Sequence, residues 1–197
     1  MANVLLFHHA LGLTPGVDAF ADVLRDAGHL VTVPDLYDGR TFSTLEAGID
    51  YAQDIGFDVL ESLGVRLAER LPAELVYIGC SLGVMPAQRL AQTRAGARGA
   101  VLVSSCLPPG AYADTWPAAV PLQVHAMAED PVFVDEGDLD AARNLVETAQ
   151  EGELVLYPGS GHFFADISSP DYDADAAHAL TARVLDLLAR ADDRSDR

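Results

Sequence analysis

The chain contains no lysine, and this absence limits the partners it can bind. Its 197 residues hold 12 arginines against 30 aspartates and glutamates, so the formal net charge is −18 at pH 7. Nucleic-acid binding needs a basic surface that neutralises phosphates. We therefore expect no nucleic-acid partner. Scattered acidic charge of this kind is typical of a solvated surface and does not by itself indicate a site.

Long apolar segments and abundant cysteine are also missing. No apolar stretch approaches the roughly 20 residues of a membrane span, and the run 4–7 near the N-terminus is too short for the core of a signal peptide. We expect no membrane partner and a cytoplasmic location. Cys80 and Cys106, the only two cysteines, each follow an apolar segment, which favours free buried thiols over a disulfide. Neither belongs to a Cys-x-x-Cys or Cys/His pattern, so no metal site is predicted.

The chain does have a regular alternation of short runs rich in Val, Leu and Ile with amphipathic segments of helical length. This alternation predicts a mostly parallel six-stranded sheet covered by helices on both faces, a three-layer α/β/α sandwich. It indicates one domain over 1–197 with a polar tail, 191–197, that frays. The expected strands are 3–8, 29–34, 74–79, 99–104, 121–127 and 153–157. The expected helices are 17–27, 44–71 as one helix or as two with breaks at Gly56 or Gly64, 82–92, 139–150 and 173–190.

A Gly-x-Ser-x-Gly motif, residues 79–83, lies between a predicted strand and a predicted helix. This is the context of a nucleophile elbow, a sharp turn that presents a serine hydroxyl. The residues two positions before and after the nucleophile must be small so that strand and helix can approach. Gly79 and Gly83 satisfy this for Ser81, whereas the corresponding neighbours of Cys80 are isoleucine and leucine. Ser81 is therefore the predicted nucleophile.

A serine nucleophile needs an adjacent base that a third group orients. In enzymes with such an elbow the partners follow in the order serine, acid, histidine. Asp130 comes just after the fifth predicted strand, and His162 lies in a Gly-rich loop after the last one. Both positions are at the C-terminal ends of strands, where parallel sheets bind ligands. The predicted catalytic residues are thus Ser81, Asp130 and His162.

Alternatives remain for the acid and the base. Glu129 and Asp135 are close enough in sequence to replace Asp130. Among the other histidines, His125 lies inside a predicted strand and is expected to pack there. His8 and His9 precede the serine, His29 lies where a predicted strand begins, and His178 lies within the last predicted helix.

The loop after the first predicted strand, residues 8–12, supplies a further element. It lies beside the elbow strand if the chain order reverses between the first and third strands. An oxyanion hole in such a site uses the N–H after the nucleophile and one from this early loop. We predict the N–H groups of Leu82 and Ala10 as the donors, with Leu11 as an alternative to Ala10. The other interpretation of this loop is an ordinary Gly-containing turn.

Together these segments resemble the dienelactone hydrolase family of α/β-hydrolases. The matching stretches are 7–16, 33–37, 79–83, 129–131 and 159–164, in family order, and the Pro-Asp-Leu-Tyr block at 34–37 is the most family-specific. The resemblance implies a minimal capless α/β-hydrolase, without metal or cofactor, that cleaves a small-molecule ester or lactone through an acyl-enzyme. A thioesterase or other acyl transfer on the same triad, and a non-catalytic binding scaffold, are the alternatives.

The resemblance also suggests a set of substrate contacts, and it includes departures from the family pattern. The founding members carry cysteine at the Ser81 position and glutamate at the His9 position. They grip a substrate carboxylate with an arginine where this chain has Asp166, and a second arginine corresponds to Arg40 only with a one-residue shift. We expect Asp166 either to lie near the acyl pocket or to point into solvent. The implied substrate-binding residues are His9, Leu11, Tyr37, Arg40, Phe163 and Asp166.

Replacing the two adjacent elbow residues separates the serine from the cysteine as nucleophile. Ser81→Ala is expected to lower kcat/KM for an activated ester by several orders of magnitude. Cys80→Ala should keep most of the activity, because only Ser81 has a glycine two residues away on each side. Inactivation by thiol reagents but not by serine reagents would contradict the assignment. The Cys80→Ala variant controls for a modified thiol that merely blocks the pocket.

Overall fold

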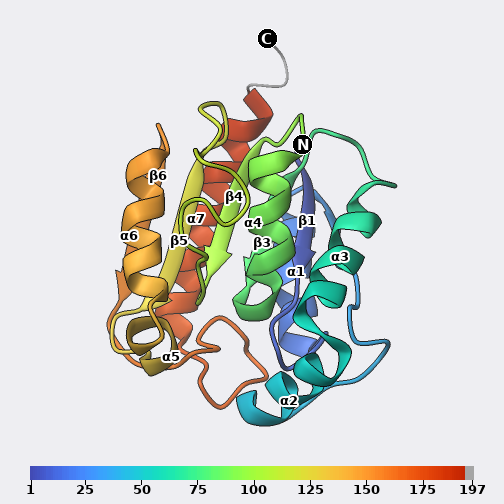
Figure 1. Cartoon of the computed structure of the whole chain (residues 1–197), viewed down its shortest axis with the longest axis vertical. Helices are drawn as coiled ribbons and strands as arrows, with labels where there is room; N and C mark the ends of the chain where they lie inside the picture. Colours follow the sequence, from blue (N-terminus) through green and yellow to red (C-terminus); the bar gives the residue numbers. More distant parts are fainter. Residues whose placement is uncertain (194–197) are drawn as a thin grey trace.

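The computed structural model describes residues 1–193, in which a six-stranded parallel sheet lies between two layers of helices (Figure 1). The strand order is β2-β1-β3-β4-β5-β6. The predicted α/β/α class is confirmed. The strands are β1 (Asn3–Phe7), β2 (Leu30–Thr32), β3 (Val76–Cys80), β4 (Gly99–Val103), β5 (Leu122–Met127) and β6 (Gly152–Tyr157).

Helices cover both faces of the sheet. In Figure 1, α3, α4 and α6 lie in front of the strands, and α1 and α7 lie behind them. Neighbouring strand residues point to opposite faces, so Phe7 and Tyr77 belong to the core under the first group while Leu6 and Ile78 belong to the core under the second. The helices are α1 (Pro15–Asp26), α2 (Leu45–Ile55), α3 (Phe57–Ala68), α4 (Val84–Thr93), α5 (Pro131–Asp135), α6 (Asp138–Thr148) and α7 (Ala174–Asp193).

The chain order reverses between β1 and β3, as the sequence suggested. These two strands are neighbours in the sheet, and Phe7 at the end of β1 lies opposite Gly79 near the end of β3. Because all strands are parallel, their C-terminal ends share one edge. The loop after β1 and the turn after β3 therefore meet at the switch point where such sheets bind ligands.

The segment predicted as 44–71 forms two helices that break at Gly56, whose φ is +98°. Gly64, the other expected break, lies inside α3. A Cβ there would be 2.7 Å from the Pro86 Cβ on α4 and 3.0 Å from the Phe7 ring. Gly64 therefore allows α3 to pack closely against α4 and the sheet, and of the two possible breaks only Gly56 is one.

Two further differences concern helix ends. The helix α7 continues through residues 191–193, which the predicted fraying tail included; residues 194–197 of that tail lie outside the described part. The short helix α5 was not predicted, because a single turn gives no amphipathic pattern. It starts where the Asp130 side chain accepts a hydrogen bond from the Val132 N–H. No helix within residues 1–193 has the length and apolar character needed to span a membrane.

Two histidines are fully buried in this fold. His125 in β5 contacts the Tyr157 hydroxyl and the Gln123 side chain. At the end of β1, His8 donates from Nδ1 to the His9 carbonyl and accepts the Leu36 N–H at Nε2. Burial lowers the pKa of His125 to about 3 and that of His8 to about 4. Both side chains are neutral in the folded protein at neutral pH.

The free energy of unfolding is expected to fall as the pH drops from about 6.5, the usual histidine pKa, towards 4. In this window the unfolded chain binds protons that the buried histidines cannot take up, so acid favours unfolding. Each such histidine contributes a slope of about 1.4 kcal/mol per pH unit. Urea unfolding at pH 7, 6 and 5 gives the slope of the unfolding free energy against pH. His125→Gln should lower this slope by the contribution of one histidine. His178→Gln, at an exposed position, is the matched control, and equal slopes in the two variants would contradict the prediction.

Candidate active site

The turn between β3 and α4 brings three backbone segments into close contact. Ser81 has a φ of +46°, in the left-handed region that non-glycine residues rarely adopt. A Cβ on Gly79 would be 2.5 Å from the Gly83 carbonyl oxygen, and one on Gly83 would be 2.5 Å from the Phe7 carbonyl oxygen. Only glycine fits at either position. The turn therefore has the strained, tightly crossed geometry of a nucleophile elbow.

The structure brings the three predicted catalytic side chains together. The distance from Ser81 Oγ to His162 Nε2 is 2.8 Å, and that from His162 Nδ1 to Asp130 Oδ2 is 2.7 Å. Asp130 is 0% exposed and His162 is 6% exposed. The second Asp130 oxygen accepts the Val132 N–H at the start of α5, which fixes the carboxylate. This arrangement can move a proton from the hydroxyl to an imidazole whose other nitrogen faces a carboxylate.

Both competing acids and three of the competing histidines, His29, His125 and His178, take no part in these hydrogen bonds. Glu129 and Asp135 are exposed, and neither is the carboxylate bonded to His162. His125 packs within its strand, as expected. His29 accepts the Ala2 N–H at the far end of the sheet, and His178 is exposed on α7.

One residue at this edge was missed by the sequence analysis. Ser104 directly follows β4, has a φ of +57°, and donates its hydroxyl to the His162 carbonyl over 2.7 Å. Its N–H donates to the His125 carbonyl. Ser104 thus connects the end of β4 to the backbone of the histidine loop. Its place immediately after a buried strand was the available signal.

A pocket of about 380 Å³, including the solvent at its mouth, opens beside Ser81. Its wall combines apolar side chains from α1, from the ends of β3 and β4 and from the loop after His162. Burial, and then the nearby Asp166 charge, raise the pKa of the Cys80 thiol to about 12. Cys80 is therefore a protonated wall residue. The lining residues are His9, Gly16, Val17, Phe20, Cys80, Ser81, Val103, Ser104, His162, Phe163, Ala165 and Asp166.

Three of the six expected substrate contacts line this pocket, namely His9, Phe163 and Asp166. Leu11, Tyr37 and Arg40 are not among the lining residues. Tyr37 is 1% exposed and donates its hydroxyl to the Gly48 carbonyl.

The segment around Tyr37 has a structural role that the family pattern did not reveal. The Asp35 carboxylate accepts the N–H groups of Tyr37 and Gly39, so the Pro-Asp-Leu-Tyr block forms a locally bonded turn. Arg40 is exposed, and its guanidinium lies 5.2 Å from the centre of the Tyr51 ring. The side chains of Tyr37 and Arg40 therefore both have partners outside the pocket.

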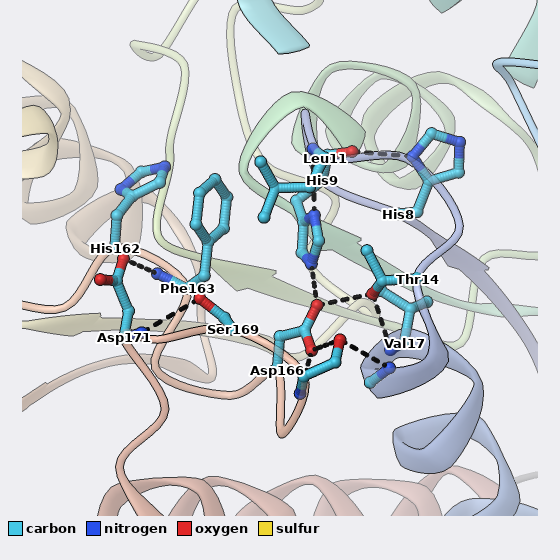
Figure 2. A network of polar contacts seen from close by, with 12 residues as sticks. His8, His9, Leu11, Thr14, Val17, His162, Phe163, Asp166, Ser169 and Asp171 are labelled. Carbon is cyan, nitrogen blue, oxygen red and sulfur yellow. Dashed lines mark hydrogen bonds and ion pairs between the residues drawn. The ribbon is translucent and has the colours of Figure 1, made fainter. Parts of the chain in front are cut away.

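Asp166 is 4% exposed, so the alternative that it points into solvent was wrong. Figure 2 shows one oxygen of its carboxylate, Oδ2, bonded to His9 and Thr14. The other oxygen, Oδ1, accepts the Ser168 N–H and hydroxyl. Burial by itself would raise the pKa of Asp166, but the hydrogen bonds from His9, Ser168 and Thr14 hold the pKa well below its usual value. The pocket wall therefore contains a fixed negative charge whose two oxygens are already occupied.

The two predicted oxyanion donors come from the elbow and from the loop after β1. Leu82 follows Ser81 in the 3-10 turn Ser81–Gly83, and Ala10 follows His9. The Leu11 N–H is directed instead at the His9 Nδ1, over 3.3 Å. Among residues 1–193, no group of three or more His, Cys, Asp or Glu side chains is arranged to hold a metal ion.

A parallel sheet with an elbow serine at its switch point defines an α/β-hydrolase fold. The fold resembles that of a dienelactone hydrolase-like promiscuous phosphotriesterase from metagenomic libraries, with a TM-score of 0.75 and 21% identity over 96% of this chain and 86% of that one. It also resembles dienelactone hydrolase from Anabaena variabilis (TM-score 0.62, 18% identity, 96% and 86% covered). A cold-adapted esterase from an Arctic intertidal metagenomic library is similar too (TM-score 0.65, 15% identity, 95% and 82% covered).

The sequence itself identifies the family. A model of the dienelactone hydrolase family matches residues 1–191. The chain belongs to the dienelactone hydrolase family, and the resemblance noted from its motifs is confirmed. Membership supports a hydrolase that acts on ester-type bonds. No curated protein sequence matches the chain.

Gly83→Ala is expected to destabilise the protein by about 3 kcal/mol, the upper end of the usual cost of overpacking, because the new methyl group would overlap the Phe7 and His8 carbonyl oxygens. Backbone atoms cannot rotate away, so activity should be lost as well. Urea unfolding and kcat measure the two effects. Gly28→Ala is the control, since its φ is +92° but its Cβ would meet nothing within 4 Å. It should cost about 1–2 kcal/mol and leave kcat unchanged; equal effects on kcat would contradict the elbow argument.

Proposed function

We propose that the chain is a serine hydrolase that cleaves a small neutral carboxylic ester or lactone through an acyl-enzyme on Ser81. The observation that carries the proposal is the pair of hydrogen bonds through His162, 2.8 Å to Ser81 and 2.7 Å to Asp130. A serine hydroxyl needs an adjacent base that a third group holds in place. Membership in the dienelactone hydrolase family supports ester-type substrates.

In the first step Ser81 Oγ attacks the carbonyl carbon while His162 Nε2 removes the hydroxyl proton. Asp130 keeps the proton of the neutral imidazole on Nδ1 and stabilises the imidazolium that forms. The N–H groups of Leu82 and Ala10 hold the oxyanion. Leu11 is less suited to this role because its N–H already donates to His9.

In the second step the tetrahedral intermediate collapses and His162 gives its proton to the departing alkoxide. An ester releases its alcohol here, whereas in a lactone the alcohol stays joined to the acyl group. Water then attacks the acyl-enzyme by the same route, with His162 as base. The carboxylic acid leaves and the Ser81 hydroxyl is restored.

The pocket wall favours a neutral, apolar acyl group. Val17, Phe20 and Val103 contribute apolar surface beside Ser81, and Asp166 contributes a negative charge. An anionic substrate would meet this charge without a cationic partner among the lining residues. The small-molecule partner and the cytoplasmic location stay predictions.

A fluorophosphonate probe tests the nucleophile against the scaffold alternative. Ser81 should carry the adduct in the peptide map. In a separate assay of ester hydrolysis, Asp130→Asn should lower kcat by about 10⁴-fold with the fold preserved, because the imidazole loses its orienting acceptor. Glu129→Gln and Asp135→Asn are matched controls at exposed positions and should keep kcat. A protein that hydrolyses no ester and takes no label at Ser81 would contradict the proposal.

A matched pair of lactones, one neutral and one bearing a carboxylate, tests the substrate charge. The neutral member should have the higher kcat/KM, by about tenfold or more, because Asp166 and the net charge of −18 both repel the anion. High salt should narrow the gap by screening the long-range part. Equal rates would remove Asp166 from substrate selection, and faster turnover of the carboxylated lactone would contradict the proposed preference for a neutral substrate.

A further inference from the structure

His9 and Asp166, two of the positions at which the chain departs from the family pattern, are bonded to each other. The distance from His9 Nε2 to Asp166 Oδ2 is 2.8 Å, and both side chains are buried (Figure 2). They come from the loop after β1 and from the loop after His162, 157 residues apart in the chain. The pair therefore connects the loop that contains Ala10 to the loop that contains His162.

The second nitrogen of His9 is also occupied. The Leu11 N–H donates to His9 Nδ1 over 3.3 Å, and a ring nitrogen that accepts an N–H carries no proton. The proton of the neutral ring is therefore on Nε2, where it is donated to the Asp166 carboxylate; this tautomer follows from the hydrogen-bond network. With both nitrogens engaged, His9 has no free site for acid–base work on a substrate.

The bond from Leu11 folds the His9 ring back over its own loop. A side chain that accepts the N–H two residues further along fixes the backbone between them, as Asn and Asp do in Asx turns. The residue between His9 and Leu11 is Ala10. Its N–H takes no part in these bonds, and it is the donor that the proposed mechanism assigns to the oxyanion.

Asp166 is held firmly enough to anchor the ring. It accepts from Thr14 Oγ1 over 2.6 Å and from the Ser168 N–H and hydroxyl over 2.7 and 2.6 Å. Thr14 is also the N-cap of α1, and Ser168 accepts the Gly16 N–H, so the carboxylate is fixed at the start of that helix. The ring of His9 further contacts the ring of Phe163, whose centre lies 4.9 Å from the centre of the His162 ring in a T-shaped arrangement.

We infer that His9, held by Asp166, is a positioning residue that sets the Ala10 N–H for the oxyanion. The inference rests on the proposed function and adds to it the positioning of the Ala10 N–H by a residue pair outside the triad. Because the oxyanion forms only in the transition state, loss of this positioning lowers kcat and leaves KM nearly unchanged.

Four variants separate the two bonds of His9 in the hydrolysis of p-nitrophenyl acetate. His9→Ala should lower kcat by about 10- to 100-fold, less than the 10²- to 10³-fold cost of deleting an oxyanion donor, with KM changed by less than about threefold. His9→Asn can still accept the Leu11 N–H and should restore kcat to within about threefold of wild type. His9→Gln reaches Asp166 but not Leu11, and should behave like His9→Ala. Asp166→Asn should also lower kcat, since its amide NH2 group would face either the His9 donor or the Ser168 N–H.

The control is His29→Gln, because His29 Nδ1 also accepts a backbone N–H, from Ala2, but lies far from the pocket. It should keep wild-type kcat and KM, and urea unfolding should show every variant folded under assay conditions. A raised KM with unchanged kcat in His9→Ala would mean direct substrate contact and overturn the inference. So would a Gln variant that keeps kcat while the Asn variant loses it. A wild-type protein without Ser81-dependent hydrolysis overturns the proposed function and this inference together.

Discussion

The geometry of the candidate site follows from the close approach of three backbone segments at the elbow. Gly79 and Gly83 let the end of β3, the start of α4 and the end of β1 come within contact of one another. That crossing forces Ser81 into a left-handed conformation at the C-terminal end of β3, where its hydroxyl is within hydrogen-bonding distance of His162. It also brings the backbone after β1 against Gly83, so the same packing places the proposed nucleophile and the proposed oxyanion donors. The strain is compensated by the two buried cores on either side of the sheet.

Around the elbow, the loops at the C-terminal edge are held by hydrogen bonds between distant segments. Asp130 fixes His162, Ser104 fixes the His162 carbonyl, and Asp166 connects the histidine loop to the start of α1. Each of these bonds is buried, so its loss would leave a polar group without a partner in a low-dielectric environment. The site is therefore preorganised before any substrate arrives, as electrostatic stabilisation of a transition state requires.

Much of this could be predicted from the sequence because the signals are local. Strand and helix alternation gave the sheet class, and Gly-x-Ser-x-Gly indicated Ser81 through the size of its neighbours. The positions of Asp130 and His162 followed from strand ends and chain order. The His9–Asp166 pair and the Ser104 contact could not be predicted, since they join residues 157 and 58 positions apart and no motif relates their partners, as the elbow and the chain order relate Ser81 to His162. Tyr37 was placed at the substrate by family pattern alone, whereas its ring packs among aromatic neighbours.

The proposed mechanism requires a covalent acyl group on Ser81, and this intermediate can be trapped. A slowly hydrolysed activated ester, quenched in acid during turnover and followed by intact mass and peptide mapping, should show one acyl group on the peptide that contains Ser81. The Ser81→Ala protein should show none. An acyl group on Cys80, or turnover that persists at the wild-type rate in Ser81→Ala, would contradict the account.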